Sequence, residues 1–392
     1  MKLQDVCELF TDGDWIESKD QSDDGIRLIQ TGNIGVGKYL EKEGREKYIS
    51  ENTFKTLNCT EIYSGDVLIS RLPEPVGRGC IIPEKQERMI TAVDCTICRV
   101  NESIVDKRYF CYYLQSSTYY NQVEQSVTGT TRKRISRKNL GNVEITIPEK
   151  EKQLKIINVL DKVSAVINAR KSELQKLDEL IKSRFIEMFG VYPANPMGWE
   201  IGTIRDIVTE VRYGSSRPAV DGGKYPYLRM NNITYGGELD LSDTKRIDIP
   251  DNELEKCTVR RGDVLFNRTN SKELVGKTCV YDRDELMVLA GFVIRIRVKD
   301  RILPEFLSAF LNTDFSKQML FGMCKTAIGQ ANINAQELQN IGLYLPPVEL
   351  QRRFVQFKKE TDKSKLTIQK SLDELETLNK ALMQKYFGGN GV

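Results

Sequence analysis

Five basic side chains crowd into the segment 130–139, which also carries hydroxyl and amide groups and contains no acid: Arg132, Lys133, Arg134, Arg137 and Lys138. Guanidinium and ammonium groups beside hydroxyls suit phosphate oxygens, and arginine can also pair bidentately with a guanine edge. The cluster therefore predicts a contact with nucleic acid. The alternative is a loop whose charges face only water.

The second half of the chain has a matching segment, 327–334, in which amides replace the charges. Its candidate side chains are Gln330, Asn332 and Asn334, and such amides can pair with an adenine edge. Two equivalent segments with different polar side chains are what two domains would need in order to recognise different short nucleic-acid sequences. A loop that has simply drifted is the alternative.

Further polar residues recur as pairs in the two halves. Arg71 and Arg268 follow equivalent strand-like motifs, and Arg78 and Lys277 lie in equivalent turns. Asn33 corresponds to Asn232, near Arg229. We predict DNA contacts for Arg71, Arg78, Arg229, Asn232, Arg268 and Lys277, with turn chemistry as the alternative for the paired basic residues and for the asparagines.

Enzyme motifs are sought and not found. The chain has no histidine, which removes Ser-His-Asp, Cys-His and His-metal chemistry. The sequence around Asn195-Pro196-Met197 fails as a methyltransferase motif, and no phosphate-binding glycine loop is present. Cys95 and Cys98 lie in a predicted strand, where residues three apart face opposite sides, so a zinc site is not expected. We expect no catalytic residue, no metal and no cofactor on this chain.

Short motifs recur at a nearly constant separation, which indicates an internal duplication. The motif at 65–71 returns at 262–268, Gln153 returns as Gln351, and Phe189 returns as Phe387, an offset of 387 − 189 = 198 residues. We predict four segments: a first mixed domain at 1–149, a long helix at 150–190, a second mixed domain at 191–347, and a second long helix with the C-terminus at 348–392.

Within each mixed domain, alternating apolar residues and turn residues predict short strands and helices. Strands are expected at 66–70, 92–100 and 143–147 in the first domain, and at 263–267, 289–298 and 341–345 in the second. Short helices are expected at 109–114 and 305–311.

The two long segments carry apolar residues at alternating steps of four and three, the pattern of a coiled-coil seam. The predicted seam comprises Ile156, Leu160, Val163, Ile167, Leu174, Leu177, Ile181, Ile368, Leu372, Leu375 and Leu382. Lys358, Thr361 and Lys365 occupy seam positions, either as a plain defect or as a place for a partner helix. Pairing the helices would bury both stripes. The sequence leaves open whether a two-fold axis crosses the helices or runs along them.

Composition is ordinary for a soluble protein, with charged residues at 29% and a net charge of +3. No apolar run is long enough to span a membrane, and no hydrophobic leader opens the sequence, so we expect a cytoplasmic protein with no membrane partner. The nine cysteines are expected to be free thiols.

The order domain–helix–domain–helix, the doubled Gly-Asp-Val-Leu motif at Gly65 and Gly262, and the junctions at Gln153 and Gln351 resemble the specificity subunit of type I restriction–modification systems. The resemblance implies an α+β fold with two tandem α/β target recognition domains, separated by two long antiparallel helices that form a coiled coil. It also implies binding to double-stranded DNA, to two methyltransferase (modification) subunits, and to restriction/translocase subunits.

Under this resemblance each domain reads one half of a split target, the helix pair sets the spacer, and S-adenosylmethionine and ATP belong to the partner subunits. Two other functions stay open from the residues alone. One is a stand-alone DNA methyltransferase or nuclease with an unrecognised site, and the other is a coiled-coil scaffold that binds only protein.

Overall fold

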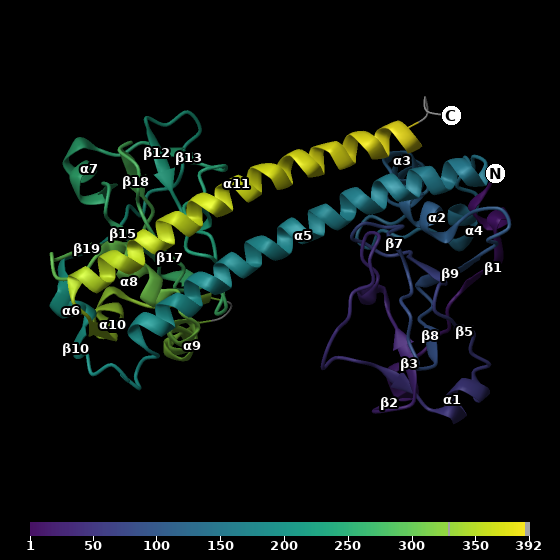
Figure 1. The fold of residues 1–392 in the computed structure, drawn as a ribbon, viewed down its shortest axis with the longest axis horizontal. Coiled ribbons are helices and arrows are strands. Elements are labelled where there is room, and N and C mark those ends of the chain that lie inside the picture. Colours follow the sequence, from purple (N-terminus) through teal and green to yellow (C-terminus); the bar gives the residue numbers. More distant parts are fainter. Residues whose placement is uncertain (328–329, 389–392) are drawn as a thin grey trace. The chain divides into compact units, whose positions relative to one another are not determined.

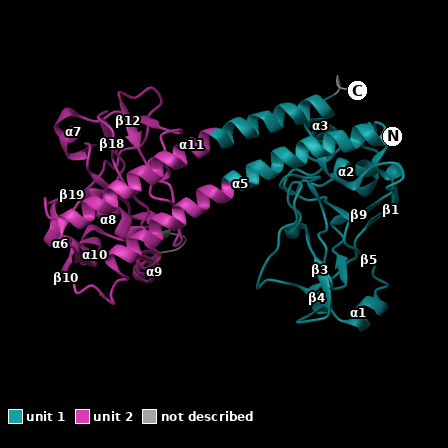
Figure 2. Cartoon of the chain, viewed as in Figure 1, with its two compact units in different colours: residues 1–170, 371–392 teal, residues 171–370 magenta. Residues whose placement is uncertain are grey.

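The structure, a computed structural model, describes residues 1–327 and 330–388, with side chains described for all of these except 325–327 and 330. The chain forms two compact units (Figure 2). Unit 1 comprises residues 1–170 and 371–392, and unit 2 comprises residues 171–370. Each unit therefore contains one half of each long helix together with one mixed domain.

The two long helices are α5, Lys150–Phe189, and α11, Val348–Phe387, and each passes from one unit into the other (Figure 1). Both contain 40 residues and no proline, so nothing in the sequence breaks their backbone hydrogen bonds. The helices predicted at 150–190 and at the start of 348–392 are confirmed.

Unit 1 contains a four-stranded antiparallel sheet in the order β1-β9-β6-β7 and a five-stranded mixed sheet in the order β2-β4-β3-β8-β5. The strands are β1 Cys7–Asp12, β2 Gln21–Ser22, β3 Ile26–Ile29, β4 Tyr48–Ile49, β5 Glu61–Ile62, β6 Val67–Ser70, β7 Gly79–Ile81, β8 Met89–Thr91 and β9 Cys95–Val100. The short helices are η1 Leu3–Val6, η2 Ser18–Asp20, η3 Thr31–Asn33, α1 Glu51–Thr56, α2 Lys107–Tyr113, α3 Ser117–Gln125 and α4 Arg137–Gly141.

Unit 2 repeats the antiparallel sheet as β11-β19-β15-β17 and has a second sheet in the order β13-β12-β18-β14. Two smaller sheets are β10-β22 and β16-β21-β20. The strands are β10 Glu200–Thr203, β11 Val208–Tyr213, β12 Tyr225–Leu228, β13 Lys245–Ile247, β14 Thr258–Val259, β15 Val264–Asn267, β16 Thr269–Asn270, β17 Thr278–Val280, β18 Met287–Leu289, β19 Val293–Val298, β20 Lys325–Ala327, β21 Gln330–Asn332 and β22 Gly342–Leu345. The short helices are α6 Ile204–Ile207, η4 Met230–Asn232, α7 Asp251–Cys257, α8 Pro304–Leu311, α9 Asp314–Met323 and α10 Ala335–Gln339.

The Gly-Asp turn that opens β6 and β15 is held in the same way in both units. Asp66 accepts a backbone hydrogen bond from Tyr63, and the Arg99 side chain grips its carboxylate at 2.9 and 3.0 Å. Asp263 is gripped equivalently by Arg297, at 2.8 Å from Nε. Burial of the two carboxylates is therefore compensated by charge-assisted hydrogen bonds, and the central strand starts at a fixed point in each sheet.

A buried glutamine joins each mixed domain to the long helix that follows it. In unit 1, Gln153 accepts from Asp106 N at 2.8 Å and donates to Ile104 O and Pro148 O. In unit 2, Gln351 accepts from Leu303 N at 2.8 Å and donates to the equivalent carbonyls of Arg301 and Pro346. The recurrence of glutamine noted in the sequence thus reflects a repeated three-hydrogen-bond junction.

In each unit, the C-terminal end of the long helix that begins in the other unit packs against the hydrophobic core. Phe387, at the end of α11, packs 5.2 Å from Tyr109 of α2 in unit 1. Phe189, at the end of α5, packs 4.8 Å from Phe306 of α8 in unit 2. In both units the start of one long helix therefore lies with the end of the other, which makes the helices antiparallel and resolves the question that the residues alone left open.

The predicted seam residues are all buried or half-buried, including the members on the second helix. Ile156, Leu160, Ile167 and Leu372 are the most enclosed. One strand prediction is wrong: residues 143–147 form only an isolated bridge, between Glu144 and Lys2, whereas the equivalent β22 pairs fully with β10. The other predicted strands and helices are present within a few residues, except that 289–298 is split into the end of β18 and β19. Among the described residues, no helix has the length and apolarity to cross a bilayer.

Candidate nucleic-acid interface

The predicted basic loop of unit 1 lies between α3 and α4, and its end is anchored beside the end of β6. Thr128 and Arg134 exchange two backbone hydrogen bonds of 2.9 Å, which closes a tight loop whose turn begins at Gly129 with a φ of 95°. Ile135 follows the loop, is fully buried, and bonds through its amide to the carbonyl of Arg71 at 3.3 Å. A buried anchor therefore holds the base of the loop while its tip is exposed.

Four of the five basic side chains of the segment 130–139 are exposed and have no acidic partner among the described residues: Arg132 and Lys133 in the loop, and Arg137 and Lys138 in the first turn of α4. Arg137 donates to Thr11 Oγ1 at 3.3 Å. Arg134 is also exposed but pairs with Asp94 at 2.9 Å. Exposed, unneutralised arginines and lysines are the groups that contact phosphates and base edges, so this loop has the placement that the DNA-contact prediction requires.

Unit 2 anchors its matching segment in the same way. The amide of buried Ile333 bonds to Arg268 O at 2.9 Å, as Ile135 bonds to Arg71 O in unit 1. Asn332 is exposed and accepts from Arg268 Nη2 at 3.0 Å. The side chain of Gln330 lies outside the described residues, so its predicted role stays a prediction.

Asn334 has a different role from the one predicted. Its Oδ1 accepts hydrogen bonds from the amides of Gln336 and Glu337 at 2.9 Å, which caps the N-terminus of α10. Ser136 caps α4 at the equivalent position of unit 1. The helix cap fixes the Asn334 side chain against its own backbone, and this arrangement contradicts its assignment as a reader of bases.

Arg71 and Arg268 both tie the end of a central strand to the turn between two other strands. Arg71 donates to Val93 O at 2.5 Å, and Arg268 donates to the equivalent Gly291 O at 3.5 Å. Arg71 is buried beside Asp12, at 3.3 Å, and burial lowers the pKa of its guanidinium. Arg71 is thus withdrawn from the surface, which makes it a weaker candidate than the exposed basic residues, and its predicted contact with DNA stays a prediction.

Arg268 is only half-buried, and it faces an aromatic ring where Arg71 faces a carboxylate. Its guanidinium carbon lies 4.7 Å from the centroid of the Tyr213 ring. Tyr213 occupies the position on β11 that Asp12 occupies on β1, because both residues pair with equivalent residues of β19 and β9. The Arg268 charge is therefore not neutralised by a carboxylate, and its predicted contact with DNA stays a prediction.

Three other predicted contacts are internal. Arg78 is buried and donates to four backbone carbonyls, the shortest being Ile34 O at 2.6 Å. Lys277 is buried and donates to Met230 O at 3.0 Å. Asn232 is buried and bonds to Asp240 O and to the amide of Arg229. These residues hold turns together, which favours the turn-chemistry alternative, and their predicted contacts with DNA stay predictions.

Arg229 is half-buried and forms an ion pair with Asp243 at 2.9 Å. Because this acid offsets its charge, Arg229 is a weaker candidate than the unpaired residues of the basic loop. Its predicted contact stays untested.

Two exposed aromatic residues near the strand ends were missed by the sequence reasoning. Trp15 is 68% exposed. It follows Asp14, whose carbonyl accepts a hydrogen bond of 2.8 Å from the amide of Val93, and Val93 lies in the turn to which Arg71 donates. Phe292 is 53% exposed and lies in the equivalent turn of unit 2. Aromatic residues in a strand-rich segment are usually buried, so only the fold reveals that these two are exposed.

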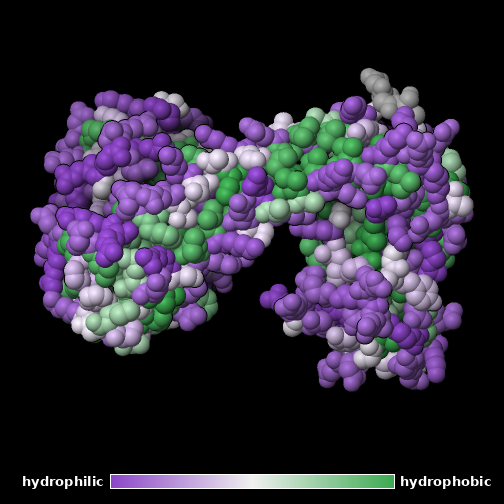
Figure 3. Space-filling model, viewed as in Figure 1, coloured by the Kyte–Doolittle hydropathy of each residue, from purple (hydrophilic) through white to green (hydrophobic). Residues whose placement is uncertain are grey.

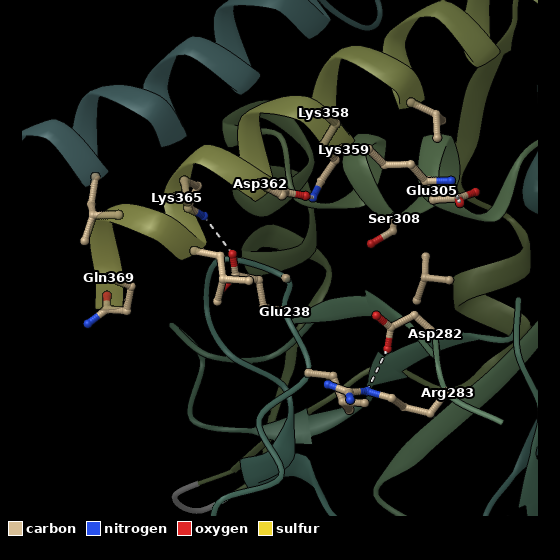
Figure 4. Close-up of a pocket in the computed structure, with 16 residues that line it drawn as sticks. Glu238, Asp282, Arg283, Glu305, Ser308, Lys358, Lys359, Asp362, Lys365 and Gln369 are labelled. Atoms are coloured by element: carbon tan, nitrogen blue, oxygen red, sulfur yellow. Dashed lines mark hydrogen bonds and ion pairs between the residues drawn. The ribbon is translucent and has the colours of Figure 1, made fainter. Parts of the chain in front are cut away.

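The polar seam residues of α11 face their own domain. A cavity of about 470 Å³ in unit 2 is lined by Lys358, Lys359, Asp362 and Lys365 of α11, with Glu238, Asp282 and Glu305 from the domain (Figure 4). Its positive and negative side chains alternate, and Lys365 pairs with Glu238 across it. Lys358 and Lys365 of the polar seam therefore make ionic contacts, a third explanation beside the two considered from the sequence, whereas Thr361 donates to Phe357 O of its own helix.

The described residues contain no group of three or more His, Cys, Asp or Glu side chains arranged to hold a metal. Cys95 and Cys98 are both buried, and they pack in different hydrophobic clusters on the two faces of β9. This confirms that the two thiols face opposite sides of the sheet.

The repeated frame can now be compared with known proteins. The sequence model described as "Type I restriction modification DNA specificity domain" matches residues 1–179 and again 196–377. The chain belongs to this specificity-domain family. The double match coincides with the duplication that the two units display.

Two relatives illustrate the specificity-domain family. The type I restriction enzyme EcoKI specificity subunit of Escherichia coli K12 is 23% identical over 390 residues, which cover 94% of this chain and 82% of that protein. The putative type I restriction enzyme MjaX specificity subunit of Methanocaldococcus jannaschii is 28% identical over 196 residues, covering 49% and 46% of the two chains.

Solved structures share the fold of the specificity-domain family. A chain from a study of complex assembly and conformational transition of the type I R-M system matches with a TM-score of 0.59 and 20% identity, covering 100% of this chain and 97% of that one. The S subunit of a type I restriction–modification system from M. genitalium matches with a TM-score of 0.54 and 14% identity, covering 99% and 95%. The predicted α+β fold, with tandem domains and a pair of long helices, is confirmed.

Proposed function

We propose that this chain is the DNA sequence-specificity subunit of a type I restriction–modification complex, in which each mixed domain reads one half of a bipartite duplex target. The family match to both halves of the chain carries the proposal. The two units support it because they share a frame and differ in the polar residues that it carries: the loop before buried Ile135 is basic, whereas the segment before buried Ile333 carries amides.

Each domain is proposed to bind DNA through the exposed polar side chains of these two equivalent segments. In unit 1, exposed Arg132, Lys133, Arg137 and Lys138 supply phosphate contacts, and any of the arginines can also read guanine. In unit 2, Arg268 and Asn332 are the candidates with described, accessible side chains. Base contacts of this kind are worth about 1–3 kcal/mol per base pair, so a few suffice for specificity.

The two long helices are proposed to set the spacer between the half-sites and to dock two methyltransferase subunits. Exposed apolar side chains on the long helices support a partner surface, because their contact with water is unfavourable. They are Leu154, Val159, Val166, Leu180 and Ile186 on α5, and Leu366 and Leu378 on α11. Figure 3 shows hydrophobic surface gathered over the long helices.

The chain itself is proposed to be non-catalytic. Methyl transfer from S-adenosylmethionine would be carried out by the methyltransferase subunits, and ATP-driven steps by restriction/translocase subunits where those are present. The DNA-bound complex would then operate in the cytoplasm, where its target is.

One experiment tests the proposal directly. The methylated bases of host DNA are mapped by single-molecule sequencing with and without the gene for this chain. We expect a methylated motif of two half-sites with a fixed gap, lost in the deletion strain. An unchanged methylation pattern, together with methyl transfer or cleavage by the purified chain alone, would favour a stand-alone enzyme; absence of salt-dependent DNA binding with partners present would favour a protein-only scaffold.

A second experiment tests the spacer role. Removing one heptad from each long helix keeps the seam in register while shortening the helix pair. We expect the accepted gap to change and the half-site sequences to stay the same. Altered half-sites with an unaltered gap would refute the spacer role.

A further inference from the structure

Lys365 of α11 holds two carboxylates from different parts of unit 2. Its ammonium group lies 2.7 Å from Asp178 on α5. It also lies 2.7 Å from Glu238, on a loop of the second mixed domain (Figure 4). The lysine side chain is 16% exposed, whereas both acids are about half exposed. One side chain thus connects both long helices to the domain that they carry.

The loop that presents Glu238 is itself fixed to the domain. Thr234 bonds to Glu238 through both its amide and its hydroxyl. At Gly237 the φ is 83°, and a Cβ there would collide with the side chain of Asn312 and with Thr278 O. Because the loop packs this closely against α8 and β17, a displacement of Glu238 would move the rest of the second mixed domain with it.

The ion pairs keep Lys365 charged within the cavity wall. Burial by itself lowers the pKa of the ammonium group, but hydrogen bonds to Asp178 and Glu238 outweigh burial and raise the pKa. A partly exposed ion pair of this kind contributes little to net stability, but its geometry favours one arrangement of the groups that it joins. It is therefore suited to fixing an orientation.

Unit 1 uses different residues at the matching places. Ile167 stands where Lys365 stands in unit 2, at the repeat offset of 365 − 167 = 198 residues, and it is buried among apolar residues. Lys38, just before the bridge residue Tyr39, stands where Glu238 precedes the bridge residue Leu239. An isoleucine and a lysine cannot form an ion pair, so this brace belongs to unit 2.

We propose that Lys365 is a positioning residue that fixes the second reading domain on the helix pair, and so fixes the gap at which the second half-site is read. The inference rests on the proposed function. It predicts that losing the brace relaxes the choice of spacer length without changing either half-site sequence.

The test uses the full chain in complex with its methyltransferase subunits, and duplexes carrying the mapped half-sites with spacers from shorter to longer than the natural one. Three variants are compared with the wild type: Lys365→Met, Lys365→Arg and Lys358→Met. The last is the matched control, because Lys358 lines the same cavity but pairs with Asp362 of its own helix at 2.5 Å.

For the wild type we expect roughly tenfold discrimination against a spacer changed by one base pair, which corresponds to about 1.4 kcal/mol. Lys365→Met should reduce that ratio to less than about threefold, while Lys365→Arg and Lys358→Met retain it. Equal loss of affinity for every spacer in Lys365→Met, or the same relaxation in Lys358→Met, would overturn the inference. If the wild type recognises no bipartite target, the proposed function fails, and the brace inference fails with it for that separate reason.

Discussion

Replacing Gln351 by leucine should weaken unit 2 by removing the hydrogen bonds that join α11 to its domain. Leucine has a similar volume, so the exchange leaves the packing nearly unchanged and deletes the polar contacts. Three groups lose their partner: the amide of Leu303 and the carbonyls of Arg301 and Pro346. The Gln351 side chain is fully buried, so water cannot replace it without rearrangement.

The magnitude follows from the number of groups stranded. A buried donor or acceptor left without a partner costs about 1–3 kcal/mol. Three such groups predict a loss of at least about 3 kcal/mol in the free energy of unfolding, a large part of the stability of an ordinary domain. Gln153→Leu should have an effect of similar size in unit 1, because its three contacts are equivalent.

The assay is urea denaturation followed by circular dichroism, with hydrogen exchange at the Leu303 amide as a local measurement. Gln356→Leu is the matched control, because Gln356 lies on the same helix but its side chain is exposed and donates to Glu360, one helical turn further along. The control should change stability by less than about 0.5 kcal/mol. A loss below about 1 kcal/mol in Gln351→Leu, with Leu303 exchange as slow as in the wild type, would refute the reasoning.

Three further outcomes are expected. Replacing Arg132, Arg134 and Arg137 by alanine should weaken DNA binding and reduce the slope of log affinity against log salt concentration by about 2–3. The circular dichroism spectrum should not change. Unchanged DNA binding would exclude this basic segment from the interface. In a Trp199→Phe background, target DNA should quench the emission of exposed Trp15, and constant emission would place Trp15 off the interface. Burial lowers the pKa of Lys317 to about 8, so the folded state binds fewer protons than the unfolded state between pH 8 and 10. The free energy of unfolding should therefore rise with pH across this window. Urea midpoints measured across this pH range should show the rise in the wild type and not in Lys317→Met.

The repeated parts of the fold could be predicted because they depend on residue pattern alone. The seam spacing located both long helices to within two residues, since steps of four and three leave little choice of face. The Gly-Asp motif located β6 and β15, because its aspartate and glycine fix a turn before a buried strand. The strand at 143–147 failed because its partner, near Lys2, forms a single bridge, and that pairing is set by the tertiary structure.

The candidate site was predicted less completely, because charge in the sequence does not reveal direction in space. Arg132 and Arg78 look alike as isolated arginines, yet the first lies on an exposed loop and the second donates inward to four carbonyls. The difference depends on whether turn carbonyls from distant segments converge on the guanidinium. For Arg78 one such carbonyl comes from Thr31, which is 47 residues away.

The pair Arg71 and Arg268 shows how one frame can support two different surfaces. Both arginines make the same backbone contact at the end of the central strand, so the frame needs an arginine in each unit. Their neighbours on the adjacent strand differ: Asp12 neutralises Arg71, whereas the Tyr213 ring leaves the charge of Arg268 intact. The residue beside the repeated arginine, rather than the arginine itself, therefore decides whether that charge is available to DNA. Exchanging Asp12 for tyrosine should accordingly leave the Arg71 charge in unit 1 without its neutralising carboxylate and strengthen DNA binding at low salt, while the reverse exchange, Tyr213→Asp, should weaken binding by unit 2. If both variants bind DNA with the affinity of the wild type, Arg268 lies outside the interface.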